Sequence, residues 1–124
     1  INSVLPIVDE FVINVGNSED NTLELIQSIN NPKIRIIQSN WNEKMVEKGY
    51  IYGQQKMIAQ FNCTGDWLFY VEGDEIYHEN DLDYIYSQME KYNDDLNIEA
   101  LAVKFIHFYG NAYSYLQSPG WMSV

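Results

Sequence analysis

Apolar and polar positions alternate along the chain with two different periods, and each change of period marks the boundary of an expected element. Residues 10–15 form a short β-branched run that predicts a strand, and the turn residues 16–18 (Gly-Asn-Ser) end it. Asn21 with Glu24 has the form of a helix cap and its reciprocal acid, and the apolar residues that follow predict a helix of about ten residues. Residues 34–37 predict a second strand, which gives a β-α-β unit with parallel pairing.

The middle of the chain predicts a loop, a helix and a buried strand. Residues 41–49 are polar and mixed, which favours a loop. The next helix ends before Gly65, and one side of it carries Ile51, Gln55, Ile58 and Phe61. Residues 67–71 (Trp-Leu-Phe-Tyr-Val) are continuously apolar, which is typical of a central strand covered on both faces. This strand leads directly into residues 72–75 (Glu-Gly-Asp-Glu), here called the acidic tip.

The last third of the chain predicts one more helix and a β-rich run. Asn80 with Asp83 offers a helix cap, and an apolar stripe follows at helical spacing, formed by Leu82, Ile85, Tyr86, Met89 and Tyr92. Residues 100–108 are β-rich, and residues 109–124 give no assignment. Because no repeat, low-complexity tract or linker divides the chain, we expect residues 1–124 to form a single α/β domain.

The composition limits the classes of partner. A formal net charge of −11 argues against binding of nucleic acid or of an anionic membrane, because both are polyanions. Cys63 is the only cysteine, which excludes an internal disulfide and a cysteine-based zinc site. No apolar run approaches the roughly 18 residues that span a bilayer, and the first residues lack the layout of a signal peptide. The sequence therefore predicts a soluble, cytoplasmic protein without a membrane span.

The acidic tip is the strongest candidate for chemistry. Ligands of open α/β sheets bind beyond the carboxyl ends of the strands, and the tip directly follows the predicted central strand. Glu72, Asp74 and Glu75 must repel one another or share a cation, and carboxylate oxygens favour Mg²⁺, Mn²⁺ or Ca²⁺. A cation held there can also bind the diphosphate of a ligand. His78 offers a third metal ligand or a phosphate donor, and an ordinary surface pair with the carboxylates is the alternative. A solvated acidic turn is the alternative reading.

The loop after the first predicted strand is the second candidate. Gly16, Ser18 and Glu19 offer a free backbone, a hydroxyl and a carboxylate at the start of a helix, which suits a base, a ribose or a phosphate. Plain helix capping explains the same residues. No phosphate-binding Lys motif, no Gly-x-Gly-x-x-Gly and no Gly-x-Ser-x-Gly is present, so these nucleotide-binding and hydrolase classes have no support.

Over residues 8–108, the order of these segments resembles a family 2 glycosyltransferase with the GT-A fold. Residues 65–75 carry the more specific part of the resemblance, because Gly-Asp, an aromatic strand and the acidic tip occur in the family's order. The resemblance implies a three-layer sandwich with a mostly parallel sheet, and inverting transfer from a nucleotide-diphosphate sugar. It also implies a Mg²⁺ or Mn²⁺ ion at Asp74 and Glu72, and nucleotide contacts by Gly16, Ser18, Glu19 and Glu72.

Departures from the family pattern leave two further functions open. Val15 and Met57 stand where an Asp and an Asn are common, which also fits a non-catalytic module for binding or assembly. Another metal-dependent nucleotide-binding enzyme, such as a nucleotidyltransferase, would use Arg35 or Lys56 to bind a triphosphate.

The resemblance also leaves parts of an enzyme unassigned. The family's first strand would precede residue 1 and its acceptor half would follow residue 124, so we expect a partial GT-A domain. We expect its open sheet edge to favour homo-oligomers. The acceptor and the catalytic base are unknown from the sequence, and Glu75 and His107 are candidates for the base by chemistry alone.

Overall fold

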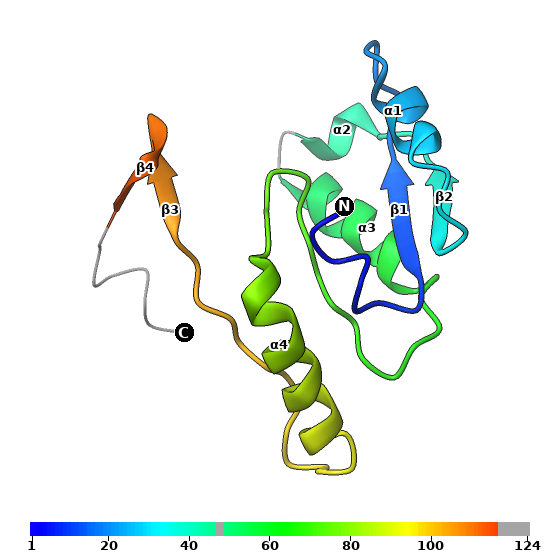
Figure 1. Ribbon diagram of the computed structural model, residues 1–124. Helices are drawn as coiled ribbons and strands as arrows, with labels where there is room; N and C mark the ends of the chain where they lie inside the picture. The colour runs from blue at the N-terminus through cyan, green and yellow to red at the C-terminus, as the bar shows by residue number, and fades with distance from the viewer. Residues whose placement is uncertain (47–48, 117–124) are drawn as a thin grey trace. The chain divides into compact units, whose positions relative to one another are not determined.

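The computed structural model describes residues 1–46 and 49–116, and the chain divides into two compact units. Ile1–Glu90 contains a pair of parallel strands and nearly all of the helical residues (Figure 1). Lys91–Val124 contains a β-hairpin. The prediction of one domain over residues 1–124 stays a prediction.

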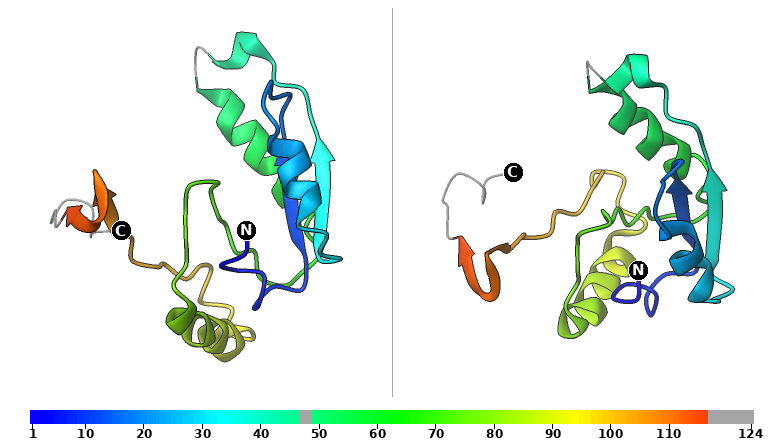
Figure 2. Two further views of the ribbon diagram at one scale, coloured as in Figure 1. Left: turned by 45° about the horizontal axis from the view of Figure 1, so that its top comes forward. Right: turned by 90° about the horizontal axis from the view of Figure 1, so that it is seen from above.

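The first unit is built on a β-α-β unit, as predicted. Strand β1 (Phe11–Val15), helix α1 (Thr22–Ser28) and strand β2 (Ile34–Gln38) follow one another, and β1 pairs with β2 in parallel from Phe11↔Ile34 to Val15↔Gln38. Both views of Figure 2 show the two strands side by side. Two neighbouring parallel strands need a crossover connection between them, and α1 provides it.

The predicted cap of α1 is wrong. The Asn21 side chain makes no capping hydrogen bond. Asp20 has that role instead, because its Oδ1 accepts from the backbone N of Thr22 at 3.0 Å and from Ser18 Oγ at 2.7 Å. The Thr22 side chain, followed by Ser18 and the Thr22 backbone N–H, lowers the pKa of Asp20 below its ordinary value by hydrogen bonding to the carboxylate.

Helices α2 (Glu43–Val46) and α3 (Tyr50–Gln60) come next. The predicted helix over 51–61 is confirmed, whereas the loop prediction for 41–49 missed the single turn of α2. α3 packs against β1. Ile51 and Gln55 are its buried residues. Because strand side chains alternate between faces, Asn14 and Arg35 face α3, while Ile34 and Ile36 line a shallow recess beside Ile26 of α1.

The predicted central strand over residues 67–71 is wrong. The segment belongs to none of the four strands found in the described residues. Trp67, Phe69 and Val71 are half-buried, whereas Leu68 and Tyr70 are exposed. A strand needs the backbone of a neighbour, and in the part of the chain that the structure describes β1 pairs with β2 alone. Only one side of this apolar segment is therefore packed against the first unit.

Helix α4 (Glu79–Tyr92) confirms the predicted helix but not its cap. It begins at Glu79, so Asn80 and Asp83 lie inside it. The backbone N of Asn80 donates to Nδ1 of His78 at 3.2 Å, which makes His78 the local capping partner. Leu82 is buried, and the described helices include none long and apolar enough to cross a bilayer.

The second unit is a small antiparallel hairpin. Strand β3 (His107–Tyr109) pairs with β4 (Asn111–Leu116) across Gly110, whose φ of 73° is the left-handed value that a tight turn requires. The predicted β-rich run was therefore right only at its end, since residues 100–106 form no strand. β4 occupies part of the stretch that gave no assignment, and residues 117–124 of that stretch lie outside the described residues.

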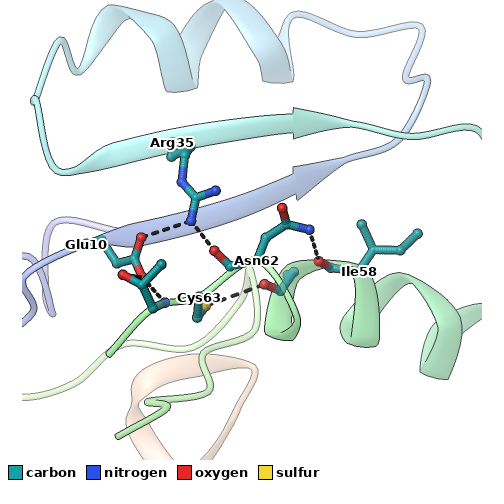
Figure 3. Close-up of polar contacts among 7 residues, drawn as sticks. Glu10, Arg35, Ile58, Asn62 and Cys63 are labelled. Atoms are coloured by element: carbon teal, nitrogen blue, oxygen red, sulfur yellow. Dashed lines mark hydrogen bonds and ion pairs between the residues drawn. The ribbon is translucent and has the colours of Figure 1, made fainter. Parts of the chain in front are cut away.

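An ion-pair cluster ties the end of α3 to the amino-terminal ends of the strands (Figure 3). Arg35 Nη2 donates to Glu10 Oε2 at 2.9 Å and also to the backbone O of Asn62. The other oxygen of Glu10 accepts from the backbone N and, at 2.8 Å, from Oγ1 of Thr64. The Thr64 backbone N–H, followed by the Arg35 guanidinium, lowers the pKa of Glu10 below its ordinary value of 4.5.

We expect Glu10→Gln to remove an acid-dependent part of the stability. The lowered pKa means that ionised Glu10 favours the folded state above pH 4.5, and that this contribution is lost as the pH falls through the folded-state pKa. Urea unfolding of both proteins between pH 7 and pH 3 should show a difference that is full near neutrality and shrinks in acid. Glu90→Gln, an exposed α4 control, should show no such trend. A difference independent of pH would refute the assignment.

Candidate functional site

Two loops meet at the carboxyl ends of β1 and β2. Gly16 follows β1, and a Cβ placed on it would lie 2.3 Å from Nε1 of Trp41, which follows β2. The bare backbone of glycine therefore allows the indole to lie directly against it. Asn17 Nδ2 also donates to Asn40 Oδ1 at 2.9 Å, which joins the same two loops by a hydrogen bond.

Trp41 and Tyr52 form an aromatic pair at this edge. Their ring centroids are 5.8 Å apart and their planes are nearly perpendicular, at 85°. Edge-to-face contact is a favourable arrangement of two aromatic rings. Trp41 is 43% exposed and Tyr52 is 55% exposed, so both rings keep accessible surface. Neither residue stood out in the sequence.

A buried polar network lies where β1, β2 and α3 meet. Asn14 Nδ2 donates to the backbone O of Gln55 at 2.9 Å and to its Oε1 at 2.8 Å, and Ser39 Oγ donates to the same Oε1. Gln55 is only 7% exposed. Among the described residues, Asn14 Oδ1 and Gln55 Nε2 are buried without a hydrogen-bond partner. The network fixes the helix against both strands.

We expect Gln55→Ala to lower the free energy of unfolding by about 1–3 kcal/mol, because the half-buried Ser39 hydroxyl would lose its acceptor and Asn14 Nδ2 would keep only the backbone O of residue 55. Chemical denaturation measures the change. Gln54→Ala is the matched control, since Gln54 is exposed on the same helix and its loss should cost less than about 0.5 kcal/mol. Equal effects of the two changes would show that the network adds no stability.

The acidic tip lies beside α3. Lys56 Nζ is 2.7 Å from Glu72 Oε1, and Tyr70 OH donates to the same oxygen at 3.2 Å. Lys56 also sits 4.8 Å from the ring centroid of Tyr70. The hydrogen bond to Glu72 raises the pKa of Lys56, and Lys56 in turn lowers the pKa of Glu72. Both side chains are about half exposed, so solvent screens the pair and its main effect is positional.

The other two acids of the tip differ from Glu72. Oε2 of Glu75 accepts from the backbone N of Glu72 at 2.9 Å, which closes the turn. Asp74 is exposed and, among the described residues, makes no hydrogen bond or ion pair. Asp74 is therefore the carboxylate of the tip that a ligand can reach without displacing a partner.

The described residues of the acidic tip do not form a metal site made of protein side chains alone. In the described ranges, no group of three or more His, Cys, Asp or Glu side chains lies close enough together to hold a metal ion. Mg²⁺ is commonly held by one or two carboxylates together with the phosphates of a ligand. Asp74 and Glu72 are the carboxylates of the tip that such an arrangement would use.

α3 connects the two candidate loops. Tyr52 and Lys56 are four residues apart on this helix, so they lie on one side of it, one turn from each other. Tyr52 contacts Trp41, which lies against Gly16, and Lys56 contacts Glu72. The sequence predicted the two loops separately, and the helix brings them to one side of the unit.

The remaining predicted site residues lie as follows. Ser18 is engaged with Asp20, and Glu19 is exposed in the same loop. His78 accepts from the start of α4. Arg35 bonds to Glu10 just before β1, at the opposite end of the strands from Gly16, which leaves it far from the carboxyl edge. His107 belongs to the second unit, where its ring stacks with that of Phe105 at a centroid distance of 6.0 Å.

Sequence reasoning missed Asn14, Ser39, Trp41, Tyr52 and Gln55. Only one local signal pointed to any of them, namely the helical spacing that places Tyr52 one turn before Lys56 and beside Gln55. The contacts of Trp41 depend on how two loops meet and have no local signal.

One of three comparisons with known proteins found a match. The protein-family profile described as Glycosyl transferase family 2 matches residues 1–122. The match covers nearly the whole chain and extends beyond the range over which the resemblance was recognised. A search of curated proteins and a search of solved structures found no match.

Proposed function

Since this chain belongs to glycosyl transferase family 2, we propose that it binds a nucleotide-diphosphate sugar and transfers the sugar to an acceptor. The supporting observation is the side of α3 on which Trp41, Tyr52, Lys56 and Glu72 gather, with Asp74 exposed next to them. Such a donor has an aromatic base at one end and a diphosphate further along. The same side of α3 offers aromatic rings and then charged groups in that order.

The proposed chemistry depends on stabilising a leaving diphosphate. Asp74 and Glu72 are the residues that would hold Mg²⁺ or Mn²⁺, and such an ion neutralises charge that develops on the leaving group. Lys56 holds Glu72 in place and offsets its negative charge, in a chain whose net charge is −11. Without a bound cation, an acidic protein would repel the diphosphate.

We further propose that transfer is inverting, because one displacement at the anomeric carbon brings the acceptor oxygen in opposite to the leaving diphosphate. A general base must then take the proton of the acceptor hydroxyl. Glu75 and His107 remain the candidates, and Glu75 already accepts one hydrogen bond from the tip backbone. In the same proposal, the β-α-β unit is part of a three-layer GT-A sandwich.

A non-catalytic binding module is the second candidate, and Val15 favours it. Val15 is 7% exposed, so the position where family members often carry an Asp is buried and apolar in this chain. A loss of donor contacts is compatible with a protein that folds and binds without turnover. Metal-dependent release of nucleoside diphosphate from UDP-, GDP- or dTDP-sugars would rule this candidate out.

We expect metal binding to depend on the nucleotide. Because the tip provides only Asp74 and Glu72, Mn²⁺ alone should bind more weakly than about 1 mM, whereas Mn²⁺ and a nucleoside diphosphate should each tighten the binding of the other. Calorimetry with Mn²⁺ in the presence and absence of UDP, GDP, CDP and dTDP measures the coupling. Tight binding of Mn²⁺ alone would contradict a shared site, and no binding of any nucleoside diphosphate or nucleotide sugar would refute the proposed function.

A further inference from the structure

We propose that Lys56 and Tyr70 determine which cation the acidic tip accepts, because they occupy one oxygen of Glu72 and leave a single oxygen of it for a metal ion. The inference rests on the proposed function and concerns the divalent ion that this function uses. Lys56 Nζ donates to Glu72 Oε1 at 2.7 Å, and Tyr70 OH donates to the same oxygen at 3.2 Å. A carboxylate oxygen has two lone pairs, so these two donors use Oε1 fully.

The two donors are held in place by α3 and by each other. Lys56 directly follows Gln55, which is 7% exposed and makes the buried hydrogen bonds that fix α3 against the strands. Lys56 Nζ also lies 4.8 Å from the ring centroid of Tyr70, a favourable distance for a cation and an aromatic face. The Glu72 side chain is 46% exposed, so a cation can reach it while both donors stay in place.

The rest of the tip offers few further oxygens. Oε2 of Glu75 accepts from the backbone N of Glu72 at 2.9 Å. Asp74 is exposed and has no partner among the described residues. A cation at the tip would therefore depend mainly on Asp74 and on one oxygen of Glu72.

This small set of oxygens favours Mg²⁺ over Ca²⁺. Ca²⁺ commonly takes about six to eight oxygen ligands and often binds both oxygens of one carboxylate. Mg²⁺ is smaller, keeps several waters and is usually bound by one or two carboxylates together with phosphates. Glu72 can bind a cation through both oxygens only if Lys56 and Tyr70 move away from Oε1. The two donors therefore disfavour the larger ion.

Calorimetry of nucleotide binding in two metal ions tests the inference. UDP, GDP, CDP and dTDP are titrated into wild type, Lys56→Met and Tyr70→Phe at saturating Mg²⁺ or Ca²⁺, and the Kd in Ca²⁺ is divided by the Kd in Mg²⁺. Both ions carry the same charge, so losing the charge of Lys56 does not by itself change this ratio. Comparing variants also cancels the affinity of each ion for the nucleotide in solution.

We expect Lys56→Met to lower the ratio about threefold or more, because Ca²⁺ can then use both oxygens of Glu72. Tyr70→Phe should lower it less, since Lys56 still occupies Oε1. Two variants serve as controls and should keep the wild-type ratio. Lys56→Arg retains a donor for Oε1, and Lys44→Met removes the same charge from an exposed position on α2.

Each outcome bears on the inference. An unchanged ratio in Lys56→Met would overturn it and leave the proposed function intact, because Lys56 would then contribute only its charge. Equal affinity of wild type in the two ions, or the same fall of the ratio in Lys44→Met, would also overturn it. If Lys56→Met does not fold, the ratio in Tyr70→Phe decides the question. If wild type binds no nucleoside diphosphate in either ion, both the inference and the proposed function fail.

Discussion

Asp74→Asn is expected to lower kcat/KM for sugar transfer by about 100-fold or more. Removing one group that stabilises a charged transition state usually reduces the rate by this factor. Asp74 is exposed and has no partner among the described residues, so its charge is available to a cation. Asn keeps the size of the side chain and removes the charge. The measurement is the rate of nucleoside diphosphate release from the best donor at fixed Mn²⁺ concentration.

Two matched changes make the result specific to Asp74. Asp83→Asn removes one negative charge from an exposed position on α4, outside the acidic tip, and should leave kcat/KM unchanged. Glu72→Gln weakens the ion pair with Lys56 and should reduce the rate less than Asp74→Asn does. If Asp74→Asn retains the rate and the Mn²⁺ dependence of wild type, the role of the tip in catalysis is disproved.

Ile51→Ala is expected to lower the free energy of unfolding by about 2–5 kcal/mol, the usual cost of a cavity left by a large aliphatic side chain. Ile51 is 0% exposed, and α3 packs on β1 through this side of the helix. The core of the described residues is small, so one lost side chain is a large fraction of it; its buried apolar members are Val4, Leu5, Val15, Ile51 and Leu82.

Urea unfolding followed by circular dichroism measures this change, and Met57→Ala is its control. Met57 is on the same helix and is 50% exposed, so its truncation should cost less than about 1 kcal/mol. Equal losses from the two variants would mean that α3 does not pack through Ile51. The same helix carries Tyr52 and Lys56, so Ile51→Ala should also weaken donor binding at temperatures near its lowered midpoint.

Local pattern predicted the elements whose formation depends on local interactions. The β-α-β unit and the helices around residues 51–61 and 80–92 were predicted from hydrophobic period, because one face of each buries against a neighbour. The exact caps were not, since Asp20 and His78 satisfy the helix starts where Asn21 and Asn80 were expected. Neighbouring polar residues compete for the same backbone N–H, and the loop geometry decides between them.

Strand predictions failed where the partner strand was missing. Residues 67–71 and 100–106 have strand-like composition, yet neither forms a ladder in the described part of the chain. Apolar composition indicates burial but does not supply the neighbouring backbone that a strand requires. Residues 67–71 therefore form no strand, although their side chains alternate between half-buried and exposed.

For the candidate site, the sequence by itself determined the family and the acidic tip, because the order of a Gly-Asp pair, an aromatic segment and clustered carboxylates is a property of the chain. Only the tertiary structure decided which acid is free, since Lys56 binds Glu72 and leaves Asp74 without a partner among the described residues. It alone also placed Trp41 on Gly16. Such contacts join residues far apart in the sequence, and they arise from how helix and strands pack rather than from any local preference.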